Sequence, residues 1–384
     1  MSNERAVLIT GATGFVGMEI LARYLDRTDR PVYVAVRAPD QPEAESRVAD
    51  TLECLFGSRE AHRDRVFAVR ADIELPGLGL GEEERDSLAE RVTDVVHCAA
   101  SVSFSLPLDR SREINVAGTE HMLEIADLCH RRGGLDRFSY ISTAYVAGTH
   151  AGEFDEDQLD AGQHFRNPYE QSKFEAEHLV RAHADRLPIQ IFRPSIVVGE
   201  RGTGWTASFN VLYTPLKAFA RGTLAALPAR RSAPVDVVPV DYVADAVFEV
   251  SQDPVESCET YHLVAGDRAT TVGRLIELSS DRLRRRAPVV IPPGFFRRAV
   301  YPVLRRRGGK VGKGLERSKV FFPYFAMDVK YDNSRARHRL EQAGIAVPPI
   351  ETYFERLLDY AMLAQWGRQP LGRAETARRI EQLH

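Results

Sequence analysis

The chain has 384 residues, of which 44% are hydrophobic and 27% are charged, and its formal net charge is −3. This composition is typical of a globular protein with a full core, and the slightly acidic balance excludes a protein that binds nucleic acid through its overall charge. The four cysteines are scattered without metal-type spacing, so we expect reduced thiols, no metal site and a cytoplasmic location. No secretory signal is evident, and no apolar run is long enough to span a membrane.

The first feature along the chain is a glycine-rich turn at residues 10–17. It follows the apolar run of residues 6–9, which predicts a buried strand, and precedes residues 18–25, whose apolar spacing predicts a helix. The first glycine permits a tight turn, the second lets the backbone approach a pyrophosphate, and the third lets helix and strand pack closely. An isolated glycine pattern would be an ordinary turn, but this context predicts a dinucleotide site with the phosphates at the helix N-terminus. The expected cofactor contacts are Gly11, Thr13, Gly14, Phe15, Val16 and Gly17.

The predicted second strand, residues 32–36, is followed at once by Arg37. A residue in this place lies beside the adenosine ribose, where an acid selects NAD and an arginine accommodates the 2′-phosphate of NADP. We therefore expect NADPH as the cofactor; the alternative is that Arg37 is a solvated loop charge. A third strand at residues 66–69 leads to Asp72, which we expect to accept a hydrogen bond from the adenine amino group, and to Ile73 beside it in the cofactor site.

Strands four and five are predicted at residues 94–97 and 138–141. Small residues after the fourth strand would let the backbone pass close to the cofactor; they are Ala99, Ala100 and Ser101. Thr143 follows the fifth strand. Because ligands of open parallel sheets lie outside the carboxyl ends of the strands, we expect the Thr143 hydroxyl to face the nicotinamide.

A helix is predicted from residue 168, where a proline suits the first turn. Tyr169 and Lys173 are four residues apart and share one face of this helix. An ammonium group beside a phenol favours the phenolate and lowers its pKa, which makes the tyrosine a usable proton donor. Alone this spacing is common, but it follows the fifth strand and Thr143. We therefore predict that Tyr169 and Lys173 are catalytic.

The sixth strand is predicted at residues 188–192, and Pro194, Ser195 and Ile196 after it are expected to contact the cofactor. Strands alternating with helices predict an α/β fold, a Rossmann-type doubly wound parallel sheet. After Gly199 the pattern changes, and strand-like runs return between residues 236 and 265. The predicted organisation is an NADP-binding Rossmann domain (1–199 plus 236–265), a smaller, mainly helical, discontinuous substrate-binding cap (200–235 plus 266–334), and a C-terminal helical segment (335–384) that packs on the cap.

Residues 281–320 are strongly basic, since thirteen lysines and arginines oppose two acidic residues. This stretch could be a docking surface for an acidic partner or for peripheral contact with an anionic membrane. The simpler interpretation is a solvated face of an arginine-rich helical domain. Nothing in it resembles a nucleic-acid module. The sequence does not indicate an oligomeric state.

The glycine turn, Thr143, Tyr169 and Lys173 together resemble the extended short-chain dehydrogenase/reductase superfamily, over most of the chain. Within it the chain is most similar to the branch of fatty acyl-CoA reductases and carrier-protein thioester reductases, which have a male-sterility-type NAD-binding domain. The stretches that carry this similarity are residues 36–38, 97–104, 115–119, 141–146 and 193–199.

The resemblance implies NADPH-dependent reduction of an acyl thioester to an aldehyde and, after a second hydride transfer, an alcohol. The acyl group would arrive on coenzyme A or on a separate acyl or peptidyl carrier protein. Thr143 would hydrogen-bond the developing oxyanion and Tyr169 would donate the proton. Lys173 would lower the tyrosine pKa and bind the nicotinamide ribose. Asn115 matches a position that steadies the lysine through water or holds helix geometry.

Three alternatives stay open. A sugar-nucleotide epimerase or dehydratase would retain NAD, which Arg37 does not favour. A ketone or hydroxysteroid-type dehydrogenase would use the same Thr-Tyr-Lys site. A non-catalytic, cofactor-sensing regulator is a third alternative, although such proteins commonly lose the Tyr or the Lys, and this chain keeps both.

Overall fold

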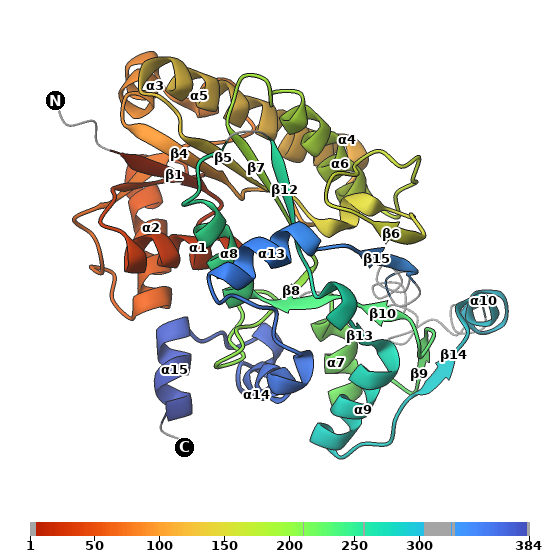
Figure 1. The fold of residues 1–384 in the computed structure, drawn as a ribbon. Helices are drawn as coiled ribbons and strands as arrows, with labels where there is room; N and C mark the ends of the chain where they lie inside the picture. Colours follow the sequence, from red (N-terminus) through yellow and green to blue (C-terminus); the bar gives the residue numbers. More distant parts are fainter. Residues whose placement is uncertain (1–4, 210, 256–257, 303–323, 325–326, 382–384) are drawn as a thin grey trace.

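A parallel sheet forms the centre of the molecule (Figure 1). The computed structural model describes residues 5–209, 211–255, 258–302, 324 and 327–381. Within these residues the main sheet has seven strands in the order β12-β7-β5-β4-β1-β2-β3, all paired in parallel. They are β1 (Ala6–Thr10), β2 (Val32–Val36), β3 (Val66–Arg70), β4 (Val92–His97), β5 (Arg137–Ile141), β7 (Ile189–Pro194) and β12 (Glu259–Leu263).

Helices cover both faces of this sheet (Figure 1). One face carries α1 (Phe15–Arg27), α2 (Gln41–Phe56) and α8 (Val240–Val250), and the other carries α3 (Glu82–Ala89), α4 (Leu108–Arg112), α5 (Gly118–Arg132) and α6 (Pro168–Arg181). Along β1, Val7 and Ile9 are buried in the core with α1, whereas Ala6 and Leu8 are buried in the core with α5. Because both faces are covered, the strand is apolar throughout. The predicted α/β doubly wound fold is confirmed.

The two strands predicted between residues 236 and 265 do not both join the main sheet. Its first strand, β11 (Val237–Pro239), pairs with β8 (Ile196–Val198) in a separate two-stranded ladder. Only β12 joins the main sheet, beside β7. Helix α8 between them packs against α1, which keeps this excursion on the Rossmann side of the molecule.

The smaller unit is built from two chain segments that pair with each other. Strand β10 (Pro234–Val235) is antiparallel to β13 (Thr270–Thr271), and β9 (Ala226–Pro228) is parallel to β14 (Val289–Ile291). Its described helices are α7 (Tyr213–Ala220), α9 (Val272–Leu283) and the short α10 (Pro293–Phe295). A further ladder joins β6 (Gly152–Phe154) to β15 (Val329–Tyr331). The expected mainly helical cap therefore also contains short strand pairs.

The C-terminal segment is shared between the two units, so the expectation that it packs on the cap is only partly right. Helix α14 (Phe354–Leu363) packs against α9 of the cap, but α13 (Ser334–Gln342) lies against α8 and β12, and α15 (Arg373–Glu381) lies against α2. Leu340 on α13 is buried in the same core as α1 and α8, and Arg339 pairs with Glu249 and Asp253 at the end of α8.

Short turns of 3₁₀ or π helix complete the described elements. The 3₁₀ turns are η1 (Pro76–Gly79), η3 (Ala144–Ala147), η4 (Gly266–Arg268), η7 (Ile350–Thr352) and η8 (Gln365–Gly367), and the π turns are η2 (Glu113–Ala117) and η5 (Phe296–Val300). Among the described residues, no helix combines the length and apolarity that crossing a bilayer requires. Residues 303–320, which hold seven of the thirteen lysines and arginines of the basic stretch, lie outside the described residues. Arg284, Arg285 and Arg286, just after α9, are exposed.

Candidate active site

The predicted site residues gather at one edge of the sheet, at the carboxyl ends of its strands. The turn between β1 and α1 is tightly packed. A Cβ on Gly11, which has φ of +73°, would stand 2.7 Å from the Ala99 nitrogen. A Cβ on Gly17 would stand 2.2 Å from the Gly11 carbonyl oxygen. Gly14 is exposed and caps α1 without any side-chain hydrogen bond. The first-turn amides of α1 thus lack a capping side chain, and the donor set fits a pyrophosphate.

A cluster of arginines surrounds Glu74, next to the position predicted for the adenosine ribose. Arg37 Nη1 donates to Glu74 Oε1 at 2.8 Å, and Arg110 from α4 reaches Glu74 Oε2 at 2.5 Å. Arg47 donates to the Arg37 carbonyl oxygen. Arg37 keeps 67% of its side chain exposed. Arg110 and Glu74 were not predicted from the sequence, since Arg110 comes from a helix that follows a later strand.

The loop after β3 holds the two residues expected near the adenine. The Asp72 carboxylate oxygen Oδ1 accepts from the Glu74 amide at 3.0 Å, so part of this carboxylate shapes the turn. The Ile73 side chain packs against Gly118 at the start of α5, where an added Cβ would stand 3.0 Å from it. Both residues lie at the same sheet edge as the glycine turn, and their contacts with a cofactor stay a prediction.

Thr143 and Tyr169 are brought together at the end of β5. The Thr143 hydroxyl donates to the Pro194 carbonyl oxygen at 3.4 Å. Burial raises the pKa of Tyr169 to about 12, and the nearby Thr143 hydroxyl offsets this only in part. The phenol is therefore protonated at neutral pH, which is the form a proton donor needs.

Lys173 makes hydrogen bonds other than the one predicted with Tyr169. Its Nζ donates to the Tyr140 hydroxyl at 2.7 Å and to the Ile141 carbonyl oxygen at 2.9 Å. The expected lowering of the Tyr169 pKa by this lysine is wrong for this structure, because burial dominates at Tyr169 and the ammonium hydrogen-bonds β5 instead. Burial lowers the pKa of Lys173 to about 8.

Asn115 joins the loop after β4 to α6. It lies in the π turn η2; its Oδ1 accepts from the Ser101 amide at 2.7 Å, and its Nδ2 donates to the Ser101 carbonyl oxygen and, at 2.9 Å, to Ser172 Oγ. Of the two roles implied by the resemblance, these contacts support the one that holds geometry. Ala99 and Ala100 precede Ser101 in this loop, while Ser195 and Ile196 follow Pro194 at the neighbouring strand end.

Two aromatic residues extend the site toward the cap. The Phe104 ring lies 5.6 Å from the Tyr169 ring and 5.4 Å from that of Tyr324, on which it stacks. Tyr324 donates to Glu170 Oε1 at 2.5 Å and accepts from Asn167 Nδ2 at 2.7 Å, so it is tied to the start of α6. In the sequence, Tyr324 belongs to the aromatic cluster at residues 321–325, whose other members lie outside the described residues.

A cavity of about 900 Å³, open mouth included, adjoins these residues. Tyr145, Ile196, Tyr324 and Tyr331 line it, together with the buried carboxylate of Asp236. The Tyr331 hydroxyl is buried and has no hydrogen-bond partner among the described residues. Because Ile196 and Tyr145 follow strands β7 and β5, the cavity lies next to the predicted nicotinamide position.

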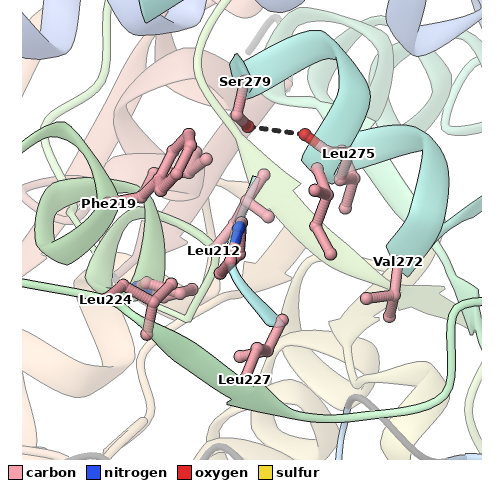
Figure 2. A pocket seen from close by; sticks show the side chains of 11 residues that line it. Leu212, Phe219, Leu224, Leu227, Val272, Leu275 and Ser279 are labelled. Carbon is pink, nitrogen blue, oxygen red and sulfur yellow. Dashed lines mark hydrogen bonds between the residues drawn. The ribbon is translucent and has the colours of Figure 1, made fainter. Parts of the chain in front are cut away.

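A second pocket, of about 440 Å³ with its mouth included, lies inside the cap between α7 and α9 (Figure 2). Figure 2 shows apolar side chains from both helices and from β9 turned toward one another, among them Phe219, Leu227 and Leu275. The hydroxyl of Ser279 donates to the Leu275 carbonyl oxygen at 2.5 Å, so it is already satisfied. The pocket therefore suits a hydrocarbon group.

An NAD-binding family model, described as male sterility protein, matches residues 9–247. The chain belongs to this family. This match confirms the prediction that the chain belongs to the extended short-chain dehydrogenase/reductase superfamily, in the branch that includes fatty acyl-CoA reductases. It also confirms that the cofactor is a nicotinamide dinucleotide.

Individual relatives agree with this placement. The chain is 33% identical to the isonitrile lipopeptide synthase of Streptomyces coeruleorubidus over 73% of its own length and 19% of that protein. It is 28% identical to the fatty acyl-CoA reductase wat of Drosophila melanogaster, over 68% of its own length and 57% of that protein. The chain thus spans less than two thirds of either relative. Among solved structures, the terminal R domain from the myxalamid PKS-NRPS biosynthetic pathway has a TM-score of 0.81 at 27% identity, covering 96% of this chain and 93% of that domain.

Proposed function

We propose that this chain is an NADPH-dependent reductase of acyl thioesters. The observation that carries the proposal is the meeting of Thr143 and Tyr169 at the carboxyl end of β5, with Lys173 buried nearby and bonded to that strand. Similarity to a fatty acyl-CoA reductase and to an R domain of a biosynthetic pathway supports a thioester as the substrate class. The acyl group would arrive on coenzyme A or on a separate carrier protein.

The proposed mechanism assigns one role each to Thr143, Tyr169 and Asn115. NADPH, when bound along the carboxyl ends of the strands, supplies a hydride to the thioester carbonyl carbon. Thr143 stabilises the negative charge that develops on the carbonyl oxygen, and Tyr169 donates its phenolic proton to that oxygen. The resulting thiohemiacetal loses its thiol and becomes an aldehyde. The hydrogen bonds of Asn115 hold the loop at Ser101 next to helix α6, so that Tyr169 stays within reach of the substrate.

The preference for NADPH over NADH rests on charge. Arg37 and Arg110 both approach Glu74, and Arg47 lies next to Arg37. Guanidinium groups bind phosphate through paired, charge-assisted hydrogen bonds. A 2′-phosphate would compete with the Glu74 carboxylate for the same donors, which makes Glu74 a residue that weakens the preference.

The cap would hold the acyl group. The cavity next to Tyr145 and Ile196 is placed for the thioester, and the apolar pocket between α7 and α9 has the chemistry to hold a hydrocarbon tail. Burial of a methylene group contributes about 0.8 kcal/mol, so several buried methylenes would give a clear preference for chain length.

The test is NADPH oxidation at 340 nm with acyl-CoA thioesters, aldehydes and ketones, each repeated with NADH. Turnover of thioesters that prefers NADPH supports the proposal. Turnover of ketones alone would make the chain a carbonyl reductase with the same site. No turnover, with NAD co-purifying, would favour an epimerase or dehydratase, and retained activity in Tyr169→Phe would favour a different chemistry altogether.

A further inference from the structure

Tyr140 is a buried residue that the mechanism above does not use. It lies on β5, with 0% of its surface exposed, and its hydroxyl is 2.7 Å from Lys173 Nζ. The same Nζ lies 4.2 Å from the centre of the Tyr140 ring. Burial raises the pKa of Tyr140 well above its usual value, so the hydroxyl stays neutral beside the lysine. A neutral hydroxyl can accept from the ammonium and still donate its own proton elsewhere.

A hydrogen-bonded chain runs from Thr10 through His97 to Thr119, and the His97 ring lies 5.8 Å from the Tyr140 ring. Its protons can be assigned from one end. Thr10 Oγ1 accepts from the amides of Cys98 and Ala99 at 3.2 and 3.1 Å, so its single proton goes to His97 Nδ1 at 2.8 Å. Burial lowers the pKa of His97 to about 3, which makes the ring neutral. Since Nδ1 accepts, Nε2 carries the proton and donates to Thr119 Oγ1 at 3.2 Å.

Thr119 closes the chain. Its proton goes to the Asn115 carbonyl oxygen at 2.6 Å, so Thr119 accepts from His97. The chain holds the neutral His97 ring 5.8 Å from the Tyr140 ring. The Tyr140 oxygen accepts from Lys173.

The other groups that face Lys173 do not take this role. Glu177, one turn further along α6, has its carboxylate occupied by Arg193 at 2.6 Å and by Ser142 at 2.6 Å. Burial raises the pKa of the Cys98 thiol, after β4, to about 11, and this keeps the thiol neutral. His97 is neutral, and burial raises the pKa of Tyr169 to about 12, so this phenol is neutral as well. Within the described residues the ammonium donates to Tyr140 and to the Ile141 carbonyl oxygen.

We propose that Tyr140 is a positioning residue that holds the Lys173 ammonium charged and directed at β5, through the hydrogen bond between its hydroxyl and Lys173 Nζ. Removing the hydroxyl would take one of two acceptors from a buried cation. The lysine would then lose its proton at lower pH. The importance of Tyr140 for turnover rests on the proposed reductase function, whereas its effect on Lys173 does not.

The chain is well suited to a direct test because it contains six lysines. The full-length protein labelled with ¹³C at the lysine ε-carbon gives few NMR signals, and Lys173→Arg identifies the one from Lys173. In the wild-type chain this signal is expected to titrate near pH 8. In Tyr140→Phe the midpoint is expected to fall by about one pH unit or more, a tenfold change in the proton equilibrium.

The matched control is Tyr24→Phe, which also removes a fully buried hydroxyl with a partner, Ser251 Oγ at 2.8 Å, but on the opposite face of the sheet. It should leave the Lys173 midpoint unchanged. If Tyr140→Phe does not fold, Tyr140→Met replaces it and should also lower the midpoint, because it removes the same hydroxyl acceptor. A Lys173 midpoint equal to the wild-type value in the variant that folds overturns the proposal. Because the titration needs neither substrate nor cofactor, absence of thioester turnover would affect only the proposed function.

Discussion

Removing the negative charge of Glu74 is predicted to strengthen the binding of NADPH, because this carboxylate occupies the arginines that would bind the 2′-phosphate. The carboxylate accepts from Arg37 at 2.8 Å and from Arg110 at 2.5 Å. Each charge-assisted hydrogen bond to a phosphate is worth about 1.5–3 kcal/mol when desolvated. Since Arg37 is 67% exposed, we discount its share to about 1–1.5 kcal/mol. Arg37→Ser should therefore weaken NADPH binding by about tenfold, and Glu74→Gln should strengthen it by about three- to tenfold.

The assay is a fluorescence titration of the chain with NADPH and, separately, NADH at low and at moderate ionic strength. Both substitutions should leave the affinity for NADH nearly the same. Their effects on the affinity for NADPH should become smaller with added salt, because the charges are exposed. Arg63→Ser, which breaks an exposed pair with Glu60 elsewhere on the surface, is the matched control and should change neither affinity. Equal loss of NADPH and NADH binding in Arg37→Ser, or weaker NADPH binding in Glu74→Gln, would refute the assignment of this cluster to the 2′-phosphate.

Three further results are expected. Tyr169→Phe should lower kcat by about 10²–10⁴-fold with NADPH binding retained; unchanged kcat would exclude Tyr169 as the proton donor. Burial alone would raise the pKa of Glu177, but Arg193 lowers it to about 2, so this carboxylate stabilises the fold above the unfolded-state pKa and the effect is lost as pH falls toward 2. Glu177→Gln should thus cost about 3 kcal/mol in urea denaturation at pH 7 and less near pH 3; a cost independent of pH would contradict this. Leu216→Trp, in the apolar pocket, should reduce kcat/KM for long acyl chains and spare short ones; an unaltered chain-length profile, like that expected for the exposed Leu363→Trp, would exclude the pocket as the tail site.

The parts of the site that could be predicted are those set by local pattern. The glycine turn between an apolar strand and a helix determines where a pyrophosphate can lie, and Gly11 and Gly17 have the close contacts that such a turn requires. Thr143 and Tyr169 follow a strand and begin a helix at the same sheet edge, so their meeting follows from the parallel fold.

The parts that could not be predicted depend on side chains from distant segments. Lys173 was expected to act on Tyr169, but its ammonium donates to Tyr140, thirty-three residues earlier on β5. Arg110 joins Arg37 only through Glu74. The amphipathic pattern of the C-terminal helices gives their apolar faces but not their partners: α15 packs mainly on α2 of the Rossmann domain.

The most direct test of the central claim is to measure free thiol release and NADPH oxidation in the same reaction with a long-chain acyl-CoA. Thioester reduction predicts thiol release that starts with NADPH oxidation, with one NADPH consumed per thiol if the aldehyde is the product and two if the alcohol is. It also predicts that Tyr169→Phe abolishes both signals together. NADPH oxidation without thiol release, or thiol release that does not depend on NADPH, would contradict the claim that this chain reduces acyl thioesters.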